Sequence, residues 1–156
     1  MRRTMSIIIL ALFLLTLAGC SLYGAPDQAE ENEIKVLIDL DLMEDIGLLL
    51  TGYTVNGEEG MSGTSNADKS MLQKDSKNLL WSYNREFLDD PAGDADVTLQ
   101  FIVVTEYFEP DYDFNYPEEA MIPMEPVSFT AEPGVTYRVT ITGDLENRYT
   151  ASLDAP

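Results

Sequence analysis

The stretch VTLQFIVVTEY, residues 97–107, is the longest alternating segment of the 156-residue chain. Its odd positions carry Val, Leu, Phe, Val, Thr and Tyr, whereas the even positions between them are of mixed polarity. Successive side chains of a β-strand point to opposite faces of a sheet. The pattern therefore predicts a long strand whose odd positions face a hydrophobic core.

Segments with the same period of two lie on both sides of that strand, at residues 34–43, 48–55, 79–84, 127–131, 137–142 and 149–153. The dipeptide Asn56-Gly57 favours a tight turn. Residues 60–70 are small and polar, which is typical of a connection between strands, with a binding loop as the alternative. About seven short strands, turn signals between them and little room for helical crossovers indicate an all-β protein with an antiparallel β-sandwich fold.

The C-terminal part of the chain resembles a known kind of module. Val127–Ala131 is followed by the turn signature Glu132-Pro133-Gly134 and by a strand pattern that ends at Gly143. This fragment is similar to the closing hairpin of immunoglobulin-like and transthyretin-like sandwiches. The resemblance implies a hairpin over residues 127–143, within a sandwich domain that we place at residues 34–156.

The first twenty residues have the three parts of a secretory signal. Arg2 and Arg3 form a positive head, residues 7–18 form an apolar run, and Leu-Ala-Gly precedes Cys20. Twelve helical residues span about 18 Å, whereas the bilayer core is about 30 Å thick. We therefore expect residues 1–19 to be removed as a signal peptide.

The ending Leu-Ala-Gly-Cys20 resembles the lipobox of bacterial lipoproteins. In that family the cysteine thiol receives a diacylglyceryl group and becomes the first mature residue. The resemblance implies lipid attachment at Cys20, membrane contact through that lipid and an extracytoplasmic location on a bacterial membrane; the alternative is an ordinary secretory signal. Residues 20–33 are small, polar and acidic, and we interpret them as a flexible tether.

Composition excludes most familiar catalytic machinery. The chain has 28 Asp and Glu against 9 Lys and Arg, no His and one Cys, and a formal net charge of −19. Sites of the Ser-His-Asp, Cys-His and thiolate-zinc types cannot be built from this set. Because nucleic-acid affinity depends on Lys and Arg neutralising phosphates, we expect no nucleic-acid partner. Paired carboxylates are the catalytic arrangement that remains, but 28 acidic residues produce many pairs by chance, so the sequence does not predict an enzyme.

The loop before residue 97 concentrates carboxylates at Asp89, Asp90, Asp94 and Asp96. Oxygen ligands on a turn suit Ca²⁺, and extracellular calcium fills weak sites. The sequence thus predicts a candidate calcium site, with a solvated turn as the alternative. No other cofactor is expected.

The stretch EYFEPDYDFNYPEE, residues 106–119, interleaves aromatic and acidic side chains. A calcium loop starting at Asp111 would have Tyr116 where an EF-hand has Gly and Ile122 where it has Glu, so the segment is not an EF-hand. If the segment is extended, Tyr112, Phe114 and Tyr116 share one face, and Asp111 and Asp113 share the other. Such a face would stack on sugars or bind a basic peptide. In the alternative, the aromatics pack on the sandwich and the acids stay in solvent.

These observations favour a membrane-anchored binding or interaction module that is not catalytic. The expected partners are a basic protein or a cell-wall polymer, because a strongly acidic surface attracts cations. Two alternatives remain open: a structural envelope component without a soluble ligand, and a carboxylate-based glycan hydrolase.

Overall fold

The structure is a computed structural model that describes residues 29–109 and 113–154. Strands form most of it, joined by two short 3-10 turns, η1 (Arg85–Phe87) and η2 (Glu118–Ala120). The strands are β1 (Glu33–Leu42), β2 (Leu48–Val55), β3 (Glu58–Thr64), β4 (Leu79–Asn84), β5 (Ala95–Val104), β6 (Met121–Pro123), β7 (Val127–Ala131), β8 (Thr136–Asp144) and β9 (Arg148–Leu153). Among these described residues, no helix is long and apolar enough to span a bilayer.

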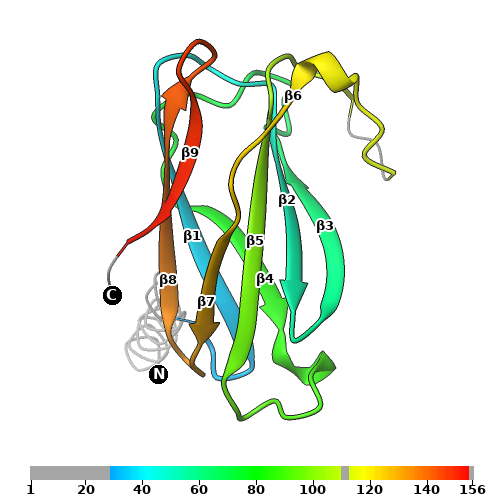
Figure 1. Cartoon of the computed structure of the whole chain (residues 1–156), viewed down its shortest axis with the longest axis vertical. Helices are drawn as coiled ribbons and strands as arrows, with labels where there is room; N and C mark the ends of the chain where they lie inside the picture. Colours follow the sequence, from blue (N-terminus) through cyan, green and yellow to red (C-terminus); the bar gives the residue numbers. More distant parts are fainter. Residues whose placement is uncertain (1–28, 110–112, 155–156) are drawn as a thin grey trace, which may run out of the picture.

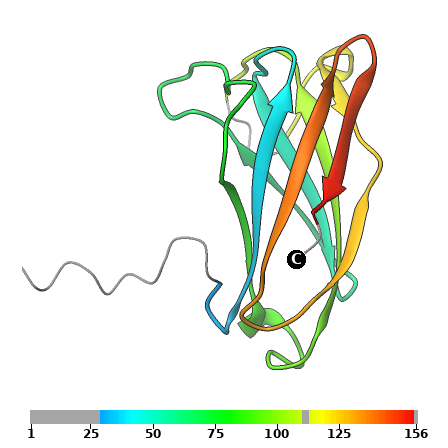
Figure 2. The same cartoon turned by 90° about the vertical axis from the view of Figure 1, so that its left-hand side faces the viewer.

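Two sheets pack face to face, which confirms the predicted all-β sandwich (Figures 1 and 2). The first sheet has the order β4-β1-β8-β9. The second has the order β3-β2-β5, and both β6 and β7 pair with the other edge of β5. Neighbouring strands are antiparallel except β1 and β8, which run parallel with Lys35 opposite Thr136. The first sheet is therefore mixed, where a purely antiparallel sandwich was expected.

The core lies between the sheets and follows the alternation of the sequence. In β5 the odd positions from Val97 to Val103 are at most 2% exposed, as predicted. In β1 the even positions from Ile34 to Leu40 are at most 1% exposed and face them. Burying each such side chain contributes roughly 1.5–3 kcal/mol. Because β5 ends at Val104, Thr105 and Tyr107 lie beyond the strand.

One strand forms where a connection was expected. Residues 58–64 make β3, the antiparallel partner of β2, so the prediction of a loop over residues 60–70 is wrong for its first half. Asn56 and Gly57 have φ of 49° and 91°, the positive values that a two-residue hairpin turn requires. β3 is an edge strand held by backbone pairing with β2, and its side chains are mostly polar or small. Its sequence therefore shows no alternation of apolar residues. With the short β6, the described residues form nine strands, where about seven were expected.

The hairpin expected over residues 127–143 is not formed. β7 pairs with β5 in the second sheet, whereas β8 pairs with β1 and β9 in the first. The turn at Glu132-Pro133-Gly134 therefore carries the chain from one sheet to the other. A hairpin and a connection between sheets have the same alternation, so the pattern alone cannot separate them.

Residues 105–109 and 113–120 lie at one end of the second sheet (yellow-green and yellow in Figure 1). They bring Tyr116 and Ala120 onto Leu48, Leu50 and Val104, which form a second buried cluster. Phe108 and Phe114 pack against it. The run Leu48–Leu50 is buried on both faces of the sheet for this reason.

Candidate functional site

The four aspartates proposed as calcium ligands lie on the surface. Asp89, Asp90, Asp94 and Asp96 are all exposed. Asp96 accepts a hydrogen bond from Thr130 Oγ1 at 3.3 Å. Among the described residues, no group of three or more potential ligands is arranged to hold a metal ion. The calcium site stays a prediction, which a rise in melting temperature with millimolar Ca²⁺ would test.

A buried cation, Arg85, helps to hold the loop that carries these aspartates. Arg85 is 0% exposed, and its guanidinium donates to Gly93 O and Ala131 O, both at 2.7 Å. Its backbone N donates to Asn32 O at 2.8 Å. Arg85 therefore joins the start of β1, the η1–β5 loop and the end of β7. The sequence analysis did not single out this residue.

The aromatic stretch predicted as a binding face takes a different conformation. Asp111 and Tyr112 lie outside the described residues. Phe114 has φ of 52°, and Tyr116 N donates to Phe114 O at 3.1 Å, so the chain turns here. Tyr116 is 8% exposed and packs in the second cluster. The extended arrangement is thus wrong for residues 114–116, and a binding role for Tyr112, Phe114, Tyr116, Asp111 and Asp113 stays a prediction.

A different aromatic group opens to solvent where β3 and β4 form the edges of the two sheets. We call it the aromatic cleft; its volume is about 470 Å³. The residues that line it are Tyr53, Glu58, Glu59, Ser82, Tyr83, Asn84 and Phe87. Tyr53 comes from β2, the two glutamates from β3 and Phe87 from η1. The cleft thus joins the β2–β3 hairpin to the β4–η1 segment, two parts of the chain that are distant in sequence.

The rings of the cleft form a chain that runs from the core to the surface. Tyr53 contacts Trp81 and Tyr83 at centroid distances of 5.6 and 5.9 Å, and Tyr83 contacts Phe87 at 6.3 Å. All three pairs meet edge to face, at 60°, 69° and 75°. Trp81 is 4% exposed, whereas Phe87 is 69% exposed. The inner ring is therefore anchored in the core while the outer ring meets solvent.

Gly60 makes room for the central ring. It lies opposite Tyr53 in the β2–β3 register. A Cβ atom on residue 60 would lie 2.3 Å from Cζ and from the hydroxyl oxygen of Tyr53. The phenol ring therefore lies across the bare glycine of the neighbouring strand. This close approach explains why a glycine is needed within β3.

A hydrogen bond ties the two sheets together at the mouth of the cleft. The Tyr83 hydroxyl donates to Glu58 Oε2 at 2.7 Å. Partial burial, then this hydrogen bond and the negative charge of Glu58, raise the pKa of Tyr83 to about 12. The hydroxyl therefore keeps its proton at neutral pH, and Glu59 beside it remains exposed.

The sequence pattern predicted the placement of two of these rings, Trp81 and Tyr83, but not their meeting with Tyr53 and Phe87. The alternation of residues 79–84 correctly placed Leu79, Trp81 and Tyr83 on one face. Phe87 belongs to η1 and follows no strand period, so it was not considered. The available signal was an aromatic residue directly after a predicted strand, flanked by Glu86.

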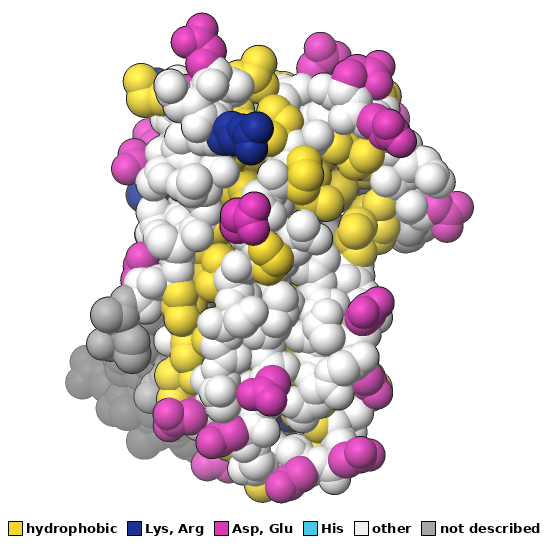
Figure 3. All heavy atoms as spheres, viewed as in Figure 1, with side chains coloured by type: hydrophobic (Ala, Val, Ile, Leu, Met, Phe, Trp, Pro, Cys, Tyr) yellow, Lys and Arg dark blue, Asp and Glu magenta, His cyan; other side chains and the backbone are white. Residues whose placement is uncertain are grey.

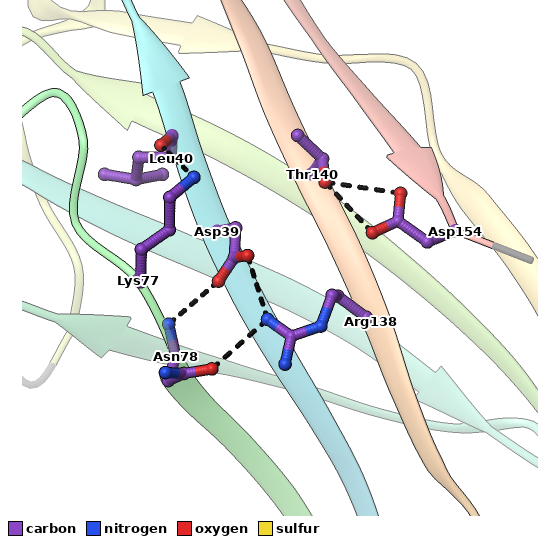
Figure 4. Close-up of polar contacts among 7 residues, drawn as sticks. All are labelled: Asp39, Leu40, Lys77, Asn78, Arg138, Thr140 and Asp154. Carbon is purple, nitrogen blue, oxygen red and sulfur yellow. Dashed lines mark hydrogen bonds and ion pairs between the residues drawn. The ribbon is translucent and has the colours of Figure 1, made fainter. Parts of the chain in front are cut away.

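A second polar group lies on the outer face of the first sheet (Figure 4). Arg138 Nη1 contacts Asp39 Oδ2 at 2.8 Å and donates to Asn78 Oδ1 at 3.2 Å. The other oxygen of Asp39 accepts from Asn78 N at 2.9 Å. Nearby, Thr140 Oγ1 donates to the Asp154 carboxylate. These partners engage one another, so the group joins β1, β8 and the start of β4 rather than presenting a site.

The chain carries a large excess of negative charge. Figure 3 shows Asp and Glu side chains spread over the visible face and gathered toward its two ends, with few Lys or Arg. This distribution agrees with the net charge of −19. The aromatic cleft shares this excess, because its described lining includes Glu58 and Glu59 but no Lys or Arg.

No family model matches the chain, and no curated protein matches it. Among solved structures, the chain is similar to the membrane-binding domain of pneumolysin, with 10% sequence identity over 80% of this chain and 97% of that domain, at a TM-score of 0.28. At that TM-score the likeness carries no argument about fold or function.

Proposed function

We propose that this protein is an extracytoplasmic lipoprotein, anchored to a bacterial membrane at Cys20, whose β-sandwich is a non-catalytic binding module with its site at the aromatic cleft. The N-terminal features of the sequence support the location. The cleft supports the binding role, because an exposed aromatic ring beside a hollow offers a large contact area to a ligand.

The carrying observation is the exposure of Phe87. At 69% exposed it lies at the outer end of a ring chain whose inner members are held by the core. A single exposed apolar residue is common on protein surfaces. Phe87 differs because its ring lines a hollow of about 470 Å³. A non-catalytic role is supported by the lack of His and by the single Cys, which the proposed lipid attachment uses.

Binding to isolated bacterial envelopes from which the membrane lipid has been extracted tests the site, because the proposed lipid at Cys20 cannot insert there. We expect Phe87→Ala in the purified full-length protein to weaken envelope binding by about threefold to thirtyfold, because truncating a ring at a binding site costs about 1–2 kcal/mol. Met43→Ala is the matched control, since Met43 is also exposed, at 70%, but lies at the far end of β1. Equal binding by both variants and the wild type would contradict the proposed site.

Mass spectrometry and fractionation test the anchor. We expect the wild-type protein to carry a diacylglyceryl group on Cys20 and to fractionate with membranes. Cys20→Ala should remain uncut and unmodified, because the thiol is the acceptor of the lipid. An unmodified wild-type Cys20, or processing that continues in the variant, would contradict the proposal.

One observation favours a second candidate, a structural envelope component. Tyr116 is buried, and the described aromatics around it pack on the second sheet rather than facing a ligand. A spacer or assembly unit would need no open site. The envelope-binding assay separates the two, because a spacer predicts no dependence on Phe87.

A further inference from the structure

We propose that the ligand of the aromatic cleft is a basic peptide segment, whose Lys or Arg side chains lie against the Tyr83 and Phe87 rings with their charged ends at Glu58 and Glu59. This inference rests on the proposed function and names the ligand class of the same site. Three observations carry it: the angles between the rings, the charge of the lining, and a neighbouring acidic hollow.

The ring angles argue against stacking on a saccharide chain. Coplanar ring faces would offer consecutive sugars one continuous surface, whereas neighbouring rings here are inclined by 60° to 75°. A cation needs only one ring face within about 6 Å. The aliphatic stem of Lys or Arg also packs on apolar surface while its charged end reaches solvent or a carboxylate. The edge-to-face arrangement therefore suits a long cationic side chain.

The two charged residues of the lining are both acidic. Within the described part of the chain, the residues that line the cleft include Glu58 and Glu59 but neither Lys nor Arg. Glu58 Oε2 already accepts the Tyr83 hydroxyl, which holds this carboxylate at the mouth of the cleft. Carboxylates beside aromatic faces are complementary to a cation in both charge and polarisability.

A second hollow extends the site along the end of β4. It has a volume of about 300 Å³ and shares Ser82 and Asn84 with the aromatic cleft. We call it the acidic hollow; its other lining residues are Glu30, Asn32 and Glu33. The two adjoining hollows thus each carry two glutamates. Such a pair fits an extended segment with more than one basic side chain.

Calorimetry and fluorescence on the purified full-length protein in neutral detergent test the inference. The probes are hexalysine, its fully acetylated form and chitohexaose. Trp81 is the one tryptophan of the chain, and its ring contacts Tyr53, so its emission reports occupancy of the cleft. We expect hexalysine to bind and change this emission, and the two neutral probes to do neither.

Two substitutions with matched controls locate the interaction. Phe87→Leu keeps apolar area but removes the ring, and we expect hexalysine affinity to fall about threefold to tenfold, the usual contribution of a partly exposed cation–π contact. Glu59→Gln should weaken binding by a similar factor. The controls are Phe87→Tyr, which keeps the ring, and Glu119→Gln, which removes an exposed charge from η2; both should bind nearly as the wild type does.

Two outcomes would overturn the inference. If Glu59→Gln and Glu119→Gln weaken hexalysine binding equally and the emission of Trp81 does not change, the attraction is to the net charge of the protein alone. If chitohexaose changes the emission and hexalysine does not, the cleft binds a saccharide. In the second case the proposed function stands, whereas loss of the Phe87 dependence in the envelope assay would remove the proposed site itself.

Discussion

Two residues, Gly60 and Tyr83, determine the shape of the aromatic cleft and the hydrogen bond at its mouth. Gly60 lets the Tyr53 ring lie across β3, and Tyr83 links the first sheet to Glu58 of the second. One effect is steric and the other electrostatic, so each can be changed without the other. Both can be tested by single substitutions.

Gly60→Ala should destabilise the protein and disturb the cleft. The added Cβ would lie 2.3 Å from two atoms of a ring that is held by Trp81 and Tyr83, so the ring must move. We expect a loss of about 1–3 kcal/mol in the free energy of unfolding, with altered near-ultraviolet circular dichroism. Gly52→Ala is the control, because its Cβ would make only ordinary contacts, at 3.6 Å or more. Equal stability of the two variants would contradict the steric argument.

Tyr83 should make stability fall at alkaline pH. Its pKa is raised to about 12 in the folded protein, against a usual value near 10 in the unfolded chain. Between these values the unfolded chain releases a proton that the folded protein retains, so rising pH favours unfolding. The contribution of Tyr83 is complete below pH 10 and is lost as the pH rises through about 12.

Urea unfolding from pH 8 to 12 measures this effect. Tyr83→Phe should lose about 0.5–1.5 kcal/mol at neutral pH, for the missing hydrogen bond, and should show a shallower alkaline decline. Some decline should remain, because burial and a hydrogen bond to Glu44 also raise the pKa of Tyr149. Parallel pH profiles for the variant and the wild type would contradict the assignment.

Among the larger elements, the described residues 105–109 and 113–120 decide whether one end of the second sheet is covered. Without them, the side chains of Leu48, Leu50 and Val104 that face away from the main core would meet solvent. Tyr116 is the buried aromatic of this cluster, and its ring contacts Phe108 at 5.9 Å. The segment therefore acts as a cover held mainly by apolar contacts.

Tyr116→Ala should loosen this cover. We expect a loss of about 2–4 kcal/mol in the free energy of unfolding, because a cavity replaces a buried ring. Exposure of Leu48 and Leu50 should also increase the binding of a hydrophobic dye. Glu119→Ala, in the same segment but exposed, should change neither quantity. If it destabilises the protein as much as Tyr116→Ala does, apolar packing is not what holds the segment.

For the whole molecule, the net charge of −19 is a source of repulsion in the folded state. Raising NaCl from about 20 mM to about 500 mM shortens the Debye length from roughly 20 Å to roughly 4 Å, and the melting temperature should rise by several degrees. The ion pair Lys69–Glu109 loses little by screening, since both side chains are more than 60% exposed. A melting temperature that falls with salt would show that attractive pairs outweigh the repulsion.

The sequence by itself determined the all-β class, most of the strands and which side chains of β1, β4 and β5 face the core. Alternation is a local property of the pleated strand, so it can be read along one segment. The interpretation of the N-terminal residues as a lipoprotein signal likewise comes from the sequence alone. Both the strand alternation and the signal pattern are defined by residues that are close together in the sequence.

The tertiary structure decided which strands pair and where the site lies. The parallel pairing of β1 with β8, the passage of residues 132–135 between sheets and the edge strand β3 all depend on partners distant in the chain. The aromatic cleft has the same origin, because Tyr53, Glu58 and Phe87 meet only when the two sheets pack. Alternation specifies a face but not the partner of that face, and this is the physical reason why the sequence did not reveal the cleft.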